Sequence, residues 1–327
     1  MFSVITIINN RTYLTVSILI IWIFLSTLSQ VFLTAKEGYS KEIDKLILPN
    51  ISSELKTSRA LQIKNEFGQF FGQAAGPLAF IFLVYYLKMP IKLTIIIDAI
   101  SFAIAWNLLR KIPNLTTEKP SSVLKSVKLL LKNKTLMSIF IIRGFLFWIS
   151  MGILNFTLTP IAVKNHHIDL RLSPLIYVAI GVGGLLFTQL FESRKINLLH
   201  DFLHKKSNST LAIFGTLTYS LAVIIYSSTI SIFYSAIALI LIGFGNGFQR
   251  ISTRDIIREN CSDADFSTFS AICFFAGRIT DFIFTLGVAK ILFSGKSLPF
   301  IGIFSGIFIL STIPFFIFIS LKEKKVS

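Results

Sequence analysis

Charged residues are scarce in this chain of 327 residues, of which only 15% are Asp, Glu, Lys or Arg. A soluble domain typically has about 25%. Two cysteines are too few for a disulfide framework, and the four histidines form no Cys/His cluster at zinc-ligand spacing. The motifs H-E-x-x-H, G-x-S-x-G and the P-loop are all missing. We therefore expect no metal, no cofactor and no enzymatic activity.

Apolar residues are abundant instead, at 53% of the chain with a mean hydropathy of +0.73. A membrane-spanning helix needs about 20 mostly apolar residues. The first apolar run is too long for a signal peptide, and no cleavage site follows it. The sequence predicts an all-α, polytopic transmembrane helix bundle of about nine spans, at 12–34, 66–88, 91–109, 138–163, 173–192, 211–229, 230–250, 267–293 and 298–319.

Acidic residues are half as frequent as basic ones, at 16 against 32, which gives a net charge of +16. Such a charge can indicate nucleic-acid binding. Here, however, 23 of the basic residues fall in alternate loops on one side of the predicted spans, and 7 on the other. This positive-inside bias places the carboxyl terminus in the cytoplasm and the amino terminus outside. We expect a multi-pass protein of the inner or plasma membrane that does not bind nucleic acid.

The longest predicted loop, 110–137, contains an amphipathic segment, 121-SSVLKSVKLLLKNK-134. Val123, Leu124, Val127, Leu130 and Leu131 recur at helical spacing, and the lysines fall between them. This pattern favours a basic helix on the cytoplasmic membrane surface, and a site for a regulatory partner is the alternative.

Several short stretches resemble the major facilitator superfamily of transporters. The segments that carry the resemblance are 59-RALQIKN-65, 72-GQAAGP-77, 98-DAISF-102, 181-GVGGLLF-187 and 242-IGFGNG-247. The second matches the first half of the antiporter motif G-x-x-x-G-P-x-x-G-G, although Phe80 and Ile81 stand where the motif has its Gly-Gly pair. The third resembles a segment common in the drug and siderophore exporter branch. The whole pattern is similar to helices 4–12 of the twelve-helix fold.

The resemblance implies three spans of a partial amino-terminal half over 1–109, a basic connector over 110–137, and a six-span carboxyl-terminal half over 138–327. It also implies proton-coupled efflux of a small molecule by alternating access. Because three helices of the family pattern are not in this sequence, the alternative is a truncated, non-transporting remnant or a membrane scaffold. The protein could act as a monomer, or as a homodimer that meets along Gly302 and Gly306.

The antiporter-like motif comprises Gly68, Gly72, Gly76 and Pro77. Small residues at four-residue spacing let a neighbouring helix approach closely, so a plain packing motif is the alternative to an exporter signature. We expect Pro77 to break or bend its helix, and Pro160 to break the outer end of the fourth span.

Ionisable residues within spans are costly and tend to face the interior of a bundle. The candidates for the transport pathway or for coupling are Asp98, Arg143, Arg278 and Asp281, joined by the polar residues Gln73 and Asn155. Arg278 and Asp281 are three residues apart and can pair, either structurally or as part of a site. Asp98 has no partner on its own helix, which suits proton coupling or a gating role. Arg143 either lines the pathway or extends to the membrane surface.

Overall fold

The computed structural model describes residues 54–90, 122–170, 172–192, 207–293 and 297–323, together with residues 93, 96, 100 and 107. Within these residues it contains helices and no strands, which confirms the predicted all-α class. The predicted span 12–34 and most of 91–109 lie outside the described residues.

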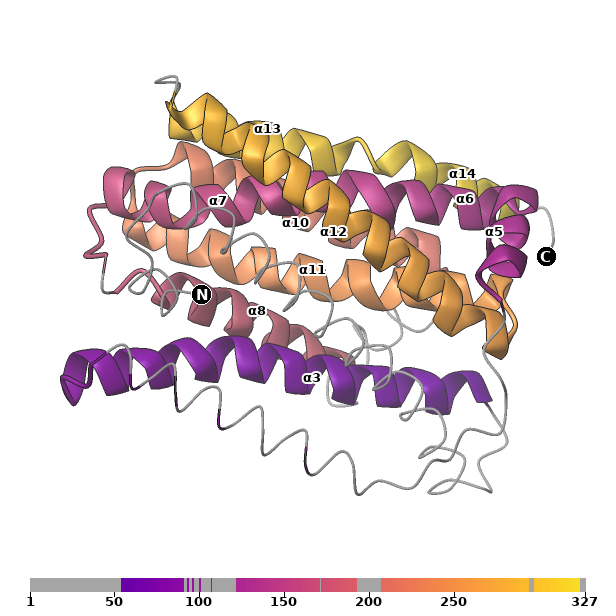
Figure 1. Cartoon of the computed structure of the whole chain (residues 1–327), viewed down its shortest axis with the longest axis horizontal. Helices are drawn as coiled ribbons and strands as arrows, with labels where there is room; N and C mark the ends of the chain where they lie inside the picture. The colour runs from indigo at the N-terminus through magenta and orange to yellow at the C-terminus, as the bar shows by residue number, and fades with distance from the viewer. Residues whose placement is uncertain are drawn as a thin grey trace. The chain divides into compact units, whose positions relative to one another are not determined.

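The chain divides into two compact units, one made of residues 1–49 and 79–119 and the other of residues 50–78 and 120–327. The described part of the first unit contains the end of helix α3 (Glu54–Ile81) and the π-helical turn η1 (Phe82–Tyr86). The second unit contains the rest of α3 and all later helices (Figure 1). Those later elements are α5 (Val123–Lys132), α6 (Lys134–Ile141), η2 (Ile142–Leu146), α7 (Phe147–Asn165), α8 (Leu175–Glu192), α10 (Asn208–Ser228), α11 (Ile232–Asn260), α12 (Asp263–Phe293), α13 (Leu298–Leu310) and α14 (Ile313–Glu323).

Five of the described helical segments are long and apolar enough to cross a membrane: Lys134–Asn165, Asn208–Ser228, Ile232–Asn260, Thr268–Thr285 and Leu298–Lys322. A shorter apolar helix covers Leu175–Leu190. Each coincides with a predicted span. Helix α3 is not among the five, because its first turns are charged and its middle carries glycine and glutamine. Its span remains a prediction.

Side-chain caps set several helix boundaries. The Ser122 hydroxyl accepts a hydrogen bond from Lys125 N at the start of α5, and Ser207 accepts one from Thr210 N at the start of α10. Asn133 lies between α5 and α6, where its side-chain oxygen accepts from Thr135 N and Leu136 N. These contacts satisfy backbone donors that the first turn of a helix leaves free. Asn133 thus sets the boundary between α5 and α6.

The breaks expected at Pro77 and Pro160 are wrong, and the bend expected at Pro77 stays a prediction. Pro77 lies inside α3 and Pro160 inside α7, and both helices continue past the proline. A proline removes one backbone hydrogen bond, and a membrane helix tolerates that loss when neighbouring groups compensate. In addition, α11 continues ten residues beyond the predicted end of its span, through Arg250, Arg254 and Arg258.

The amphipathic connector helix forms as α5, but its apolar residues do not share one environment. Leu130 is buried against the bundle together with Ser126, whereas Val123, Leu124 and Leu131 are exposed. Lys125 lies 3.8 Å from the Asp265 carboxylate of α12, which helps to hold α5 at the end of the bundle. The helix therefore packs on the bundle along one edge and leaves a second apolar edge uncovered.

Glycines bring three helices of the second unit into backbone contact, and these helices follow one another in Figure 1 as α8, α11 and α10. A Cβ on Gly183 would overlap the Ile240 carbonyl, and a Cβ on Gly243 would overlap the Ile180 carbonyl. A Cβ on Gly245 would lie 2.6 Å from Tyr219 N of α10. Small residues at contact positions are how membrane helices approach closely without a hydrophobic driving force.

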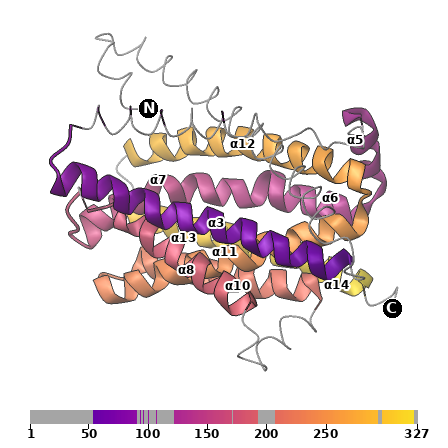
Figure 2. The same ribbon diagram turned by 90° about the horizontal axis from the view of Figure 1, so that it is seen from below.

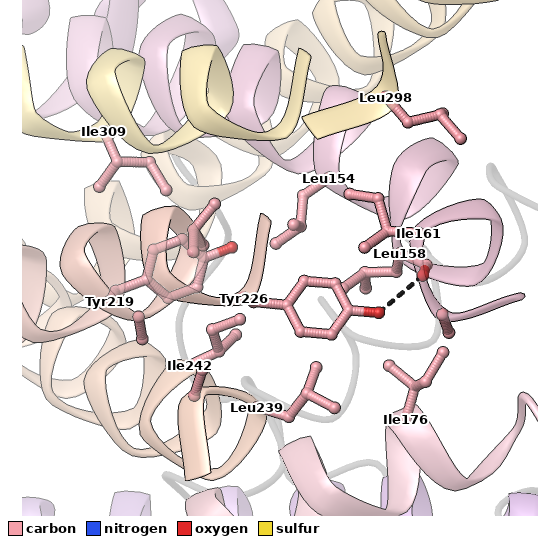
Figure 3. Close-up of a cluster of buried hydrophobic side chains, with 14 residues drawn as sticks. Leu154, Leu158, Ile161, Ile176, Tyr219, Tyr226, Leu239, Ile242, Leu298 and Ile309 are labelled. Atoms are coloured by element: carbon pink, nitrogen blue, oxygen red, sulfur yellow. Dashed lines mark hydrogen bonds between the residues drawn. The ribbon is translucent and has the colours of Figure 1, made fainter. Parts of the chain in front are cut away.

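The largest buried apolar cluster joins α7, α8, α10, α11 and α13 (Figure 3). Two tyrosines of α10 lie within it, and both hydroxyls have partners on α7. The Tyr226 hydroxyl donates to Leu158 O at 2.8 Å, and the Tyr219 hydroxyl donates to Met151 Sδ at 2.9 Å. A buried hydroxyl without a partner would be costly, so these bonds fix the position of α10 against α7.

Candidate functional site

Arg278 and Asp281 lie one turn apart on α12, within a segment that is long enough to span a membrane. The Arg278 Nη1 atom is 3.6 Å from Asp281 Oδ2, as the spacing predicted. The Asp281 side chain is 10% exposed and that of Arg278 is 31% exposed. The pair thus lies at the margin of the bundle interior, where a small molecule or water can reach the arginine.

Aromatic rings enclose the Arg278 guanidinium. Its Cζ atom lies 4.7 Å from the ring centroid of Trp148 on α7 and 4.7 Å from that of Phe274 on α12. The two rings meet edge to face, with centroids 5.4 Å apart. Cation–π contact stabilises a guanidinium in such a place and fixes its orientation. The charge is therefore held at a defined point between α7 and α12.

Two glycines make room for this arrangement. A Cβ on Gly152 of α7 would lie 2.7 Å from Asp281 Oδ1, and a Cβ on Gly277 of α12 would overlap the Trp148 indole. The Thr280 hydroxyl donates to Gly144 O at 3.0 Å and ties α12 to η2, the turn that leads into α7, which lies beside α12 (Figure 2). The carboxylate thus faces the backbone of α7 directly. The site can hold a proton at Asp281 and a negatively charged or polar group at Arg278.

Arg143 lies in the π-helical turn η2, which interrupts the predicted fourth span. Its Nη1 atom donates to the Thr253 hydroxyl of α11 at 3.4 Å. π-Helical turns inside α-helices are frequent at functional sites. Arg143 therefore contacts a neighbouring helix inside the bundle.

A second charged group joins α3 to α11. The Glu66 side chain is 1% exposed and lies between two arginines of α11. Arg250 Nε is 3.0 Å from Glu66 Oε2, and Arg254 Nη1 is 2.8 Å from Glu66 Oε1. Gln69, one turn further along α3, accepts a hydrogen bond from Arg250 at 2.5 Å. We call Glu66, Gln69, Arg250 and Arg254 the α3–α11 charge cluster.

Buried amides lie on the same two helices as this cluster. The oxygens Gln73 Oε1 and Asn246 Oδ1 are buried and have no hydrogen-bond partner among the described residues. Both amide atoms of Gln249 are in the same state. Such atoms are costly to bury unless something else binds them. They mark a polar stretch beyond the charge cluster that a solute or water could occupy.

The other sequence candidates do not join these groups. Asn155 on α7 is exposed, and Asp98 lies outside the described residues. The contact stripe expected on α3 stays a prediction, because the described residues include no partner for it. No described atom lies within 4 Å of a Cβ built on Gly72 or Gly76. Phe70 and Ala74 of α3 make the close contacts instead, against Gly184 and Gly181 of α8.

Gly302 and Gly306 do not form a face for a second copy of the chain. Both are buried within the bundle, and a Cβ on either would collide with α10, at Ser227 and Ile224 respectively. These glycines are packing positions inside one chain. The expectation of a dimer along them is wrong, because the spacing of small residues cannot show which helix they face.

Sequence reasoning missed Glu66 and His166. His166 follows α7 and is buried, with its Nε2 atom 3.0 Å from the Ser235 hydroxyl of α11 and its ring 5.4 Å from that of Tyr226. It fastens one end of α7 to α10 and α11. Neither residue belongs to a motif. The only sequence signal for Glu66 is the pair of arginines one turn apart near the end of α11, because a carboxylate on another helix could neutralise both.

Neither cysteine suits nucleophilic chemistry. Burial raises the pKa of the Cys261 thiol, which follows α11, to about 11, and the charge of Asp265 adds to the shift. A thiol with that pKa stays protonated at neutral pH, and the thiolate is the reactive form. Among the described residues no group of His, Cys, Asp and Glu could hold a metal ion.

Comparison with known families places these helices in context. Residues 64–285 match the family model described as the Major Facilitator Superfamily. The match begins within α3 and ends within α12, so it includes the charge cluster and the Arg278–Asp281 pair. The comparison with curated proteins finds no match.

Proposed function

As a member of the major facilitator superfamily, this chain is a multi-pass membrane transporter of small molecules, and we propose that it exports its substrate in exchange for protons by alternating access. The observation that carries the proposal is the Arg278–Asp281 pair between α7 and α12. A carboxylate within a membrane span is a typical proton-binding group in transporters.

The coupling step follows from the contacts of the pair. When Asp281 is ionised, its charge offsets that of Arg278, and the aromatic rings hold the guanidinium in place. A polar or cationic group of the substrate can bind the ionised carboxylate, and protonation of Asp281 removes the charge that holds this group. Proton and substrate would then compete for one carboxylate, as exchange requires.

The α3–α11 charge cluster supplies the conformational part of the proposal. It lies at the end of the bundle that the basic loops predict to be cytoplasmic. Helix α3 belongs to the predicted amino-terminal half, and α11 to the carboxyl-terminal half. Glu66 therefore closes that end, and its two ion pairs must separate before the end can open. Truncating one partner of a buried ion pair typically costs about 3–5 kcal/mol, so such a contact can bias the equilibrium between two states.

The coupling is tested with vesicles that contain the purified chain and an imposed pH gradient. A panel of compounds first identifies a transported substrate, by comparison with vesicles that lack the protein. Asp281→Asn keeps the size of the side chain but cannot take up a proton. We expect it to abolish pH-driven transport while substrate exchange at equal pH continues.

The control is Asp169→Asn, which removes an exposed carboxylate from the segment after α7. It should leave transport unchanged. Asp98→Asn tests the second predicted carboxylate in the same assay. Full pH-driven transport in both Asp281→Asn and Asp98→Asn would refute coupling through these residues.

A further inference from the structure

A groove of about 450 Å³ opens on the outer surface where α5, α6 and α14 meet. The residues that line it are mostly apolar: Leu131, Lys134, Met137, Ser138, Pro314, Phe315 and Phe318. Its volume lies within the range of about 300–1,000 Å³ that is usual for small-molecule sites. It is separate from the Arg278–Asp281 pair and from the α3–α11 charge cluster.

The groove lies where two membrane spans begin and end. Helix α6 begins the segment Lys134–Asn165, and α14 ends the segment Leu298–Lys322. The Lys322 ammonium donates to the Thr135 hydroxyl at 3.1 Å, so these two ends are at the same level. From Lys322 back to Pro314 is eight residues, or about 12 Å along a helix. The groove thus runs from the membrane surface into the first part of the apolar layer.

Ser138 donates its hydroxyl to Lys134 O, and the charged lining is confined to the surface end of the groove. Lys134 is exposed there, and no carboxylate pairs with it among the described residues. Its neighbours Lys128 and Lys132 on α5 are basic too. The deeper lining consists of Met137, Pro314 and Phe315. A ligand that fits must carry a negative charge at one end and an apolar chain at the other.

Two features of the fold keep the groove open. The last span is broken between α13 and α14, at Ser311 and Thr312, and α14 begins with Ile313 and Pro314. Helix α5 borders the surface end, with Leu131 66% exposed and Leu130 buried beneath it. The uncovered apolar edge of α5 is therefore continuous with the groove. Both are suited to contact with lipid.

From this geometry we propose that the groove binds one anionic phospholipid. Lys134 pairs with the phosphate, and an acyl chain lies against Met137, Phe315 and Phe318. Basic pockets between helices at a membrane surface recognise anionic head groups in this way. An anionic lipid is favoured over a second copy of this chain, because the lining combines one cation at the membrane surface with apolar side chains at the level of the hydrocarbon layer. The proposal does not depend on the direction or coupling of transport.

Native mass spectrometry of the full chain, stripped of lipid in detergent, tests the proposal. The protein is titrated with phosphatidylglycerol or with phosphatidylcholine that has identical acyl chains. We expect one phosphatidylglycerol to bind more tightly than any phosphatidylcholine. One lysine near the surface contributes about 1 kcal/mol to the binding of anionic lipid, so Lys134→Ala should weaken this binding about fivefold.

Further variants separate charge from shape. Lys134→Glu should abolish the preference for phosphatidylglycerol, and Lys134→Arg should keep it. Leu131→Trp narrows the groove at an exposed position without changing any charge, and should weaken the binding of both lipids. Lys164→Glu is the matched control, because Lys164 is exposed at the far end of α7. It should bind phosphatidylglycerol like the unmodified chain.

Three results would overturn the proposal. The first is equal loss of binding in Lys134→Glu and Lys164→Glu. The second is displacement of the lipid by glycerol phosphate, which has the charged end but no acyl chain. The third is a dimer that forms in place of the lipid complex and is broken by Leu131→Trp.

Discussion

Gly183 and Gly243 show how much a single glycine contributes when another helix lies against it. Each faces a backbone carbonyl of the opposite helix, so α8 and α11 meet without an intervening side chain. Gly76, on α3, has no described atom near the place where a Cβ would stand. Packing therefore requires glycine at Gly183 and Gly243, and no described neighbour requires it at Gly76.

We expect Gly183→Ala to destabilise the protein, because an added methyl group forces α8 away from Ile240. Overpacking of this kind costs about 1–3 kcal/mol. Thermal unfolding of the purified protein in detergent would show a lower midpoint. Gly76→Ala is the control, and should leave the midpoint unchanged or raise it, since alanine favours a helix by up to about 1 kcal/mol. Equal effects of the two changes would contradict the packing seen between α8 and α11.

At this scale, sequence separation limits what can be predicted. Arg278 and Asp281 were predicted to pair because they are neighbours on one helix. Glu66 was not identified, because Arg250 and Arg254 lie 184 and 188 residues away along the chain. Their positive charges were assigned to a loop. Only the packed helices show that they meet one buried carboxylate.

Helix α11 extends ten residues beyond the end that apolar length predicts. Its apolar part ends near Arg250, yet the helix continues to Asn260 and carries arginines one turn apart. Because the extension is helical, it holds Arg250 and Arg254 at fixed positions beside Glu66, which a short loop could not do. The contact with Glu66 therefore depends on the last three turns of α11 as much as on α3.

Glu66→Gln should weaken the attachment of α3 to α11, because it removes the charge that both arginines share. Spin labels at Lys64→Cys of α3 and Glu259→Cys of α11, with Cys261 and Cys273 replaced by serine, would report the distance between the two helices on either side of the charge cluster. We expect a broader distribution with a longer component than in the labelled protein that keeps Glu66. Glu66→Asp, which keeps the charge on a shorter side chain, should have a smaller effect.

An unchanged distance distribution in Glu66→Gln would show that packing of Phe70 and Ala74 on α8 is sufficient to hold α3. The charge cluster would then have no part in opening this end. Transport by Glu66→Gln should be measured as well, because a variant that has lost its fold would not transport whatever its distance distribution.

Apolar length predicted the helices well and their interruptions poorly. The predicted span 173–192 agrees closely with α8 at Leu175–Glu192. The break between α13 and α14, and the π-helical turn at Ile142–Leu146, left no mark in composition. Both depend on where hydrogen-bond donors find acceptors in the packed state. Prolines were misleading for the same reason, since Pro77 and Pro160 lie within continuous helices.

For the molecule as a whole, composition was sufficient for the fold class, and the family match agrees with it. A helix in a membrane bundle contacts lipid on one face and other helices on the other, so both faces are apolar. A content of 53% hydrophobic residues therefore indicates such a bundle. The sites were harder to predict, because several helices contribute to each. Asp281 faces Gly152 of α7, and Arg278 lies against Trp148 of the same helix.

Two kinds of contact divide the second compact unit. Helices α8, α11 and α10 meet at glycines, where backbone contacts backbone, and around these points through buried apolar side chains. Helices α3 and α11 meet through charged side chains, which can separate and pair again. The first kind suits a body that moves as one piece, and the second suits a surface that opens and closes during transport.

The backbone contact at Gly183 and Gly243 also has a consequence for the history of this protein. Neither position can accept a side chain, and a change at one cannot be relieved by a change at the other, because both are already the smallest residue. In related sequences these two sites should stay glycine after most of the surface has diverged. Among the described residues, no atom holds Gly72 or Gly76 of α3 to the same requirement.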